Sequence, residues 1–192
     1  MHFSRSLEFH QHGQHEQERE QLEQAVRHDP YNADILIAMH RAPGAPESWQ
    51  KQTRQRIQRL TERFRRDILL AERGYQVAPT DRNRDLLALT LNQSAWLAAN
   101  TDGDCRAALE SSRKSLELLP DDPGYLDTLG RCYFALGDFD NALKHQRRAV
   151  ELEPHSGQIR RQLELFEKEQ QQRQKQEVPT TQDAAPRFPD AK

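Results

Sequence analysis

The sequence predicts an all-helical protein: an α-solenoid of stacked antiparallel helix pairs, with a long central helix and a C-terminal capping helix. Only 35% of the 192 residues are apolar, which is too few for one thick globular core. Leucine outnumbers isoleucine and valine together, 22 to 9, and this favours helices over strands. One segment also recurs at an offset of 34 residues, a period typical of stacked helical units.

The composition argues against several other classes of protein. A net charge of −2 creates no overall field for nucleic acid or an anionic membrane. The longest continuous apolar run, 35–39, is too short to cross a bilayer. Two cysteines cannot build a disulfide framework or, alone, a zinc site. No signal segment opens the chain, so we favour the cytoplasm.

The repeat is clearest where Gly103–Pro120 aligns with Gly137–Pro154. In the second copy, Asp122 and Pro123 suit the start of one helix, and Gly137 and Asp138 separate it from the next. A helix pair of this size cannot bury its apolar faces alone, so its neighbours must stack on it. Eight pairs are identical: Gly103/Gly137, Asp104/Asp138, Ala108/Ala142, Leu109/Leu143, Arg113/Arg147, Glu117/Glu151, Leu118/Leu152 and Pro120/Pro154.

Residues 125–154 closely resemble a tetratricopeptide repeat (TPR). The unit departs from the family pattern at Gln146, where an aromatic residue is usual, and we expect weaker packing there. The preceding unit, 89–120, is a looser match, with Trp96 at the usual glycine position. The features that carry the resemblance are Leu129-Gly130, Tyr133, Gly137-Asp138, Ala142, Ala149 and Pro154.

The flanking segments extend the array at both ends. Gly13, Ala25 and Pro30 have the spacing of another turn and second helix, so we expect a chain that starts within a repeat, as the C-terminal part of a longer bacterial-type array. A stripe with a mean step near 3.7 residues, from Trp49 to Tyr75, predicts the long helix. The expected units are a partial repeat (1–30), an irregular helical segment (31–88) with a long helix at about 46–76, repeats at 89–122 and 123–156, a capping helix (157–177) and a disordered tail (178–192).

The resemblance implies a non-catalytic scaffold whose first helices line a concave groove for a peptide or a partner helix. Chaperone-binding members hold a carboxylate at first-helix positions that here carry other residues, and Asp127 would repel it, although Arg131 and Arg161 could pair with an acidic ligand. The expected groove residues are Gln93, Leu97, Asn100, Asp127, Arg131, Phe134, Gln158, Arg161 and Gln162.

Two other functions stay open at this point. One is nucleic-acid binding through the basic helix 51–66, and the other is self-association, in which the long helix packs on a copy of itself. The cations of the basic helix are Lys51, Arg54, Arg56, Arg59, Arg63, Arg65 and Arg66.

The chain offers little for catalysis or cofactors. It has no Gly-x-Ser-x-Gly, no glycine-rich phosphate loop and no His-Glu-x-x-His, so we expect neither an enzyme nor a cofactor. His10, His12 and His15 lie close together, but Gly13 interrupts them and no acidic residue stands at ligand spacing among them. We therefore expect no native metal site, and we expect Cys105 and Cys132 to be independent core residues.

Overall fold

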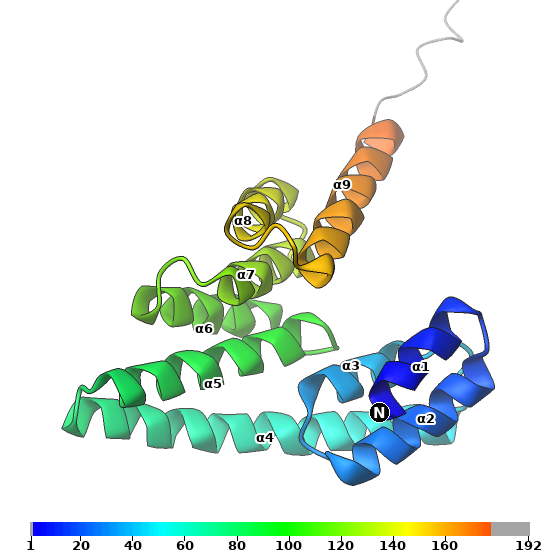
Figure 1. Ribbon diagram of the computed structural model, residues 1–192, viewed down its shortest axis with the longest axis horizontal. Coiled ribbons are helices and arrows are strands. Elements are labelled where there is room, and N and C mark those ends of the chain that lie inside the picture. The colour runs from blue at the N-terminus through cyan, green and yellow to red at the C-terminus, as the bar shows by residue number, and fades with distance from the viewer. Residues whose placement is uncertain (1, 178–192) are drawn as a thin grey trace, which may run out of the picture.

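The computed structural model describes residues 2–177, which form helices throughout and contain no strand (Figure 1). The predicted fold class, an all-helical solenoid, is confirmed. The tail predicted to be disordered, 178–192, lies outside the described residues. The helices are α1 (His2–Gln11), α2 (His15–His28), α3 (Ala33–Arg41), α4 (Glu47–Val77), α5 (Asp81–Ala99), α6 (Cys105–Leu118), α7 (Pro123–Ala135), α8 (Phe139–Leu152) and α9 (Gly157–Glu177).

The helices stack as successive antiparallel pairs. Each helix packs against the next, so α1/α2, α3/α4, α5/α6 and α7/α8 are pairs and α9 closes the series (Figure 1). The first helices of successive pairs also touch, because α3 packs on α5, α5 on α7 and α7 on α9. These four helices form what we call the inner face of the array.

Helix ends are defined by local sequence. Asp122 and Asp138, predicted as N-caps, accept hydrogen bonds from the backbone N–H of Tyr125 and Asn141. Asn32, Thr80 and Asp104 cap α3, α5 and α6 in the same way. Gly137 ends the α7 region at a φ of 80°, where a glycine is favoured.

The irregular middle of the chain is a helix pair of unequal lengths. The nine-residue α3 is followed by the 31-residue α4, whereas α2, α6 and α8 each have 14 residues. The extra length of α4, together with the 19-residue α5, disrupts the 34-residue spacing between Pro30 and Pro120. The pairing continues through this region although the sequence period does not.

The apolar stripe of α4 packs within its own chain. Leu60 and Phe64 join a core with Leu22 and Leu36, and Trp49 packs at its edge. Further along, Ala71 packs with residues of α5. The stripe that would have driven self-association is therefore already covered. Among the described residues, no helix combines the length and apolar character needed to cross a bilayer.

The turn between α5 and α6 requires a glycine at position 103. A Cβ there would lie 2.6 Å from the Cα of Ala98, and backbone atoms cannot move aside as a flexible side chain could. Gly74, inside α4, has no atom within 4 Å of its would-be Cβ. Gly74 therefore serves as the control position for a substitution at Gly103.

We predict that Gly103→Ala destabilises the protein by about 1–3 kcal/mol, because the added methyl group overpacks the turn. Gly74→Ala should leave stability unchanged or raise it by up to about 1 kcal/mol, because alanine loses less entropy in a helix. Urea unfolding followed by circular dichroism measures both. Equal effects of the two substitutions would contradict the close approach at Gly103.

Candidate partner-binding surface

Hydrogen bonds connect the first helices across every junction of the inner face. At the α3–α5 junction, Trp96 Nε1 donates to Asp34 Oδ1 at 2.8 Å, and Arg41 donates to Asn100. At the next junction, Arg131 Nε donates to the carbonyl oxygen of Ala99 at 3.0 Å. At the α7–α9 junction, Gln162 Nε2 donates to the backbone oxygen of Asp127 at 3.0 Å. Polar side chains thus help fix how each pair sits on the next.

Two arginines meet near the C-terminal end of α5. Arg41, from α3, contacts Asn100, and Arg131, from α7, contacts the neighbouring carbonyl of Ala99. Burial lowers the pKa of Arg131 to about 10, and repulsion from Arg41 adds to the shift. Burial of the charged end also lowers the pKa of Arg41, although that residue as a whole is exposed. Among the described residues, neither arginine has a carboxylate within ion-pair distance.

An aromatic surface lies beside this arginine pair. Phe134 stacks on Phe166 of α9 with ring centroids 4.3 Å apart, and it meets Phe139 edge-on at 5.3 Å. The guanidinium of Arg131 lies 5.1 Å from the Phe134 ring centroid, within cation–π range. Phe134 keeps part of its surface exposed, so cationic and apolar groups are adjacent on the inner face.

A buried polar group joins α7, α8 and α9. Gln146 Nε2 donates to Asp127 Oδ1 at 2.5 Å and to the carbonyl oxygen of Ile159 at 2.9 Å. Gln162 Nε2 lies 3.0 Å from both the Asp127 carboxylate and its backbone oxygen. We expected weaker packing at Gln146 from the missing aromatic ring. Instead this side chain is fully buried and makes hydrogen bonds that a phenyl ring could not make.

Burial raises the pKa of Asp127 to about 6, and the hydrogen bond from Gln146 partly opposes the shift. Each buried amide helps stabilise the carboxylate, but no cation pairs with it among the residues that the structure describes. The negative charge therefore destabilises the folded state when Asp127 is ionised.

The predicted groove residues fall into three groups. Gln93, Gln158 and Arg161 are exposed, and Arg131, Phe134 and Gln162 are half-buried. Leu97, Asn100 and Asp127 are buried, at 1%, 4% and 4% exposure. A partner cannot reach these last three side chains. They are therefore structural residues, and not the contact residues that the sequence analysis expects.

These three side chains are buried because α5 and α7 are covered on more sides than a two-repeat array implies. Leu97 packs in the core shared by α2, α3 and α4, whose position the sequence did not reveal. Arg41 was missed because it stands at the start of a Pro/Gly break. The unusual glutamine at position 146 was the one available signal for the buried Asp127 group.

Two cations of the basic helix make ion pairs with acidic residues. Arg56 pairs with Glu23 at 2.9 Å, and Arg63 pairs with Asp67 at 3.4 Å while stacking over Tyr31. Arg54 and Arg65 instead line an open cleft of about 560 Å³ between α4, α5 and α6. The small side chains of α6, such as Ala108, leave this space beside α4.

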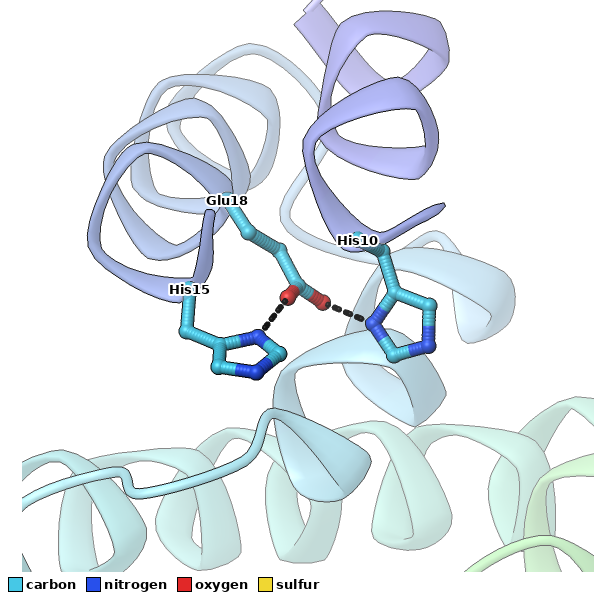
Figure 2. A group of neighbouring side chains, drawn as sticks. All are labelled: His10, His15 and Glu18. Atoms are coloured by element: carbon cyan, nitrogen blue, oxygen red, sulfur yellow. Dashed lines mark hydrogen bonds and ion pairs between the residues drawn. The ribbon is translucent and has the colours of Figure 1, made fainter. Parts of the chain in front are cut away.

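The histidine cluster is arranged differently from the sequence expectation. His10 Nδ1 lies 2.9 Å from Glu18 Oε1, and His15 Nδ1 lies 3.3 Å from Glu18 Oε2 (Figure 2). An acidic residue therefore does stand at ligand distance, which corrects that expectation. Glu18 was missed because it lies one helical turn beyond His15. His12 contacts the backbone oxygen of Glu8 instead.

Both cysteines are free thiols. Cys132 is buried, and burial raises its pKa to about 12, with a further contribution from the nearby Cys105. Its thiol is therefore held in the protonated form, which is the unreactive one.

The comparisons with known proteins bear on the second repeat. The tetratricopeptide repeat family matches residues 123–156, which span α7 and α8 and the turns beside them. The chain contains a tetratricopeptide repeat. The resemblance inferred from the Leu129-Gly130 and Gly137-Asp138 pairs is confirmed by this match. The search of curated proteins found no significant match.

Several solved structures overlap with most of the chain at low identity. The TPR domain of P58(IPK) is 17% identical, with a TM-score of 0.46, and the match covers 91% of this chain and 47% of that one. MamA from MSR-1 is 20% identical, with a TM-score of 0.41 and coverages of 91% and 87%. A thermophilic TPR protein from Thermus thermophilus is 15% identical, with a TM-score of 0.41 and coverages of 88% and 81%. The chain therefore spans about half the length of the first of these and most of the others.

The buried Asp127 group predicts a pH dependence of stability. Because the folded-state pKa of Asp127 is about 6 and the ordinary value for an aspartate is 3.8, the folded state binds more protons between these values. Its contribution to stability is therefore present at acid pH and is lost as pH rises through about 6.

We predict that Asp127→Asn stabilises the protein at pH 7 by up to about 3 kcal/mol, the equivalent of about two pKa units. The asparagine oxygen keeps the hydrogen bonds without the charge. The advantage over wild type should vanish near pH 4, where Asp127 is neutral in the folded state. Urea unfolding of both proteins at pH 4 and pH 7 tests this. A difference that does not change with pH would contradict the buried, unpaired carboxylate.

Proposed function

We propose that the protein is a non-catalytic scaffold that binds an acidic peptide segment along the inner face of α3, α5, α7 and α9. Tetratricopeptide repeats generally mediate protein–protein interaction. The observation that carries the acidic specificity is the arginine pair, Arg41 and Arg131, which lacks a carboxylate partner among the described residues.

Arg41 and Arg131 both have lowered pKa values. Burial and repulsion from Arg41 both disfavour the charged form of Arg131. The attraction of a negative charge placed between the two guanidinium groups would offset both effects. A carboxylate can accept two hydrogen bonds from one guanidinium, which gives geometric as well as charge selectivity. An acidic side chain or a C-terminal carboxylate of a partner supplies this group.

Neighbouring side chains provide the remaining contacts. Phe134 offers an apolar surface beside Arg131, and apolar burial supplies affinity that does not depend on charge. Gln93, Gln158 and Arg161 are exposed along the same set of first helices and are available for polar contacts. The proposed ligand is therefore an extended segment with acidic residues next to an apolar one.

The test uses fluorescein-labelled peptides that place Asp or Glu beside Leu or Phe, with matched peptides carrying Asn or Gln. We expect anisotropy to detect binding of the acidic peptides and at least about tenfold weaker binding of the neutral ones, since a hydrogen bond to a charged group contributes about 1.5–3 kcal/mol. The double variant Arg41→Gln/Arg131→Gln should lose the preference.

Arg106→Gln is the control for loss of a surface charge, because Arg106 is an exposed arginine of α6. It removes one positive charge, and the double variant removes two. It should alter affinity less than about twofold, within the range of a screened surface charge. Circular dichroism confirms that each variant is folded. Equal binding of acidic and neutral peptides, or equal losses in Arg106→Gln and the double variant, would refute the proposal.

A further inference from the structure

Glu18 is a buried carboxylate whose side-chain partners are two histidines. Its side chain is 5% exposed, and it lies in the first turn of α2. Among the described residues, no lysine or arginine lies within ion-pair distance of it, and its carboxylate contacts the Nδ1 atoms of His10 and His15. A buried carboxylate is costly unless a positive charge compensates it.

The α1–α2 turn brings the three side chains together. Gly13 has a φ of 68°, a conformation that favours glycine, and the chain reverses there. The end of α1 supplies His10, while the start of α2 supplies His15 and Glu18 (Figure 2). One potential ligand atom from each residue lies within 4.8 Å of the other two.

These separations suit a small divalent metal ion. Bonds of about 2.0–2.1 Å in a tetrahedral site place neighbouring ligand atoms about 3.3 Å apart. The observed Nδ1–oxygen distances, 2.9 and 3.3 Å, are close to that value. His10 Nδ1 and His15 Nδ1 contact different oxygens of Glu18, so binding of one ion requires the three side chains to turn toward a common centre. His10 is about half exposed, which leaves a side open for metal entry and for a water ligand.

We propose that His10, His15 and Glu18 bind a divalent transition metal ion of the zinc class and so fasten α1 to α2. Two imidazoles and one carboxylate are ligands that Zn²⁺, Co²⁺, Ni²⁺ and Cu²⁺ accept, whereas Ca²⁺ and Mg²⁺ prefer oxygen ligands throughout. The ion would place a positive charge beside the buried Glu18 carboxylate. Because it joins two helices, it stabilises the first pair of the array.

The experiment titrates the EDTA-treated, dialysed full chain with ZnCl2 by isothermal calorimetry, with CaCl2 as the second cation. We expect one zinc ion per chain with a micromolar Kd, a higher melting temperature with zinc, and no binding of calcium. His10→Ala and Glu18→Gln should each weaken zinc binding at least tenfold. His10→Ala removes a half-exposed side chain, so we expect this variant to keep the fold even if a change at Glu18 disturbs it.

His12→Ala is the matched control, because His12 is in the same segment but contacts the Glu8 backbone. Its zinc affinity should stay within about twofold of wild type. As an independent readout, Co²⁺ in place of zinc should show visible d–d absorption in wild type and His12→Ala, and this should disappear in His10→Ala. No binding by wild type, or equal loss in His12→Ala and His10→Ala, would overturn the proposal.

Discussion

The close approach of neighbouring helices at small residues is the constraint on which the rest of the structure depends. At the α7–α8 contact, a Cβ on Gly130 would lie 2.8 Å from Gln146 Oε1 and 3.2 Å from the Ala142 carbonyl oxygen. At the α5–α6–α7 contact, the buried layer consists of Ala95, Ala99, Ala108 and Cys132. Only side chains of this size let the helices come near enough for the inner-face hydrogen bonds to form.

The same inner face must hold the array together and remain available to a ligand. Arg131 donates one hydrogen bond to α5 and presents the remainder of its guanidinium beside Phe134. Asp127, by contrast, is buried, and its carboxylate accepts hydrogen bonds from Gln146 and Gln162 where α7, α8 and α9 meet. Polar side chains of first helices therefore divide into those that fix the stack and those that remain accessible, and burial distinguishes the two.

The features that depend only on local sequence could be predicted. The 34-residue offset, the caps Asp122 and Asp138, and the stripe of α4 follow from spacing and from residue type, and these define helices and their pairing. The burial of Leu97 and the meeting of Arg41 with Arg131 depend on how a short α3 and a long α4 pack on α5, which no local pattern encodes. Glu18 likewise joins His10 only after the chain turns at Gly13.

The most direct test of the stacked array is the response of its N-terminal half to a change in its C-terminal half. Trp49 and Trp96, the two tryptophans, lie in α4 and α5, whereas Ala142 is fully buried in α8. Ala142→Leu should overpack α8 at a cost of about 1–3 kcal/mol. If the pairs stabilise one another, the urea midpoint seen by tryptophan fluorescence should fall together with that seen by circular dichroism. A tryptophan transition that stays at the wild-type midpoint while the circular dichroism transition shifts would contradict the account.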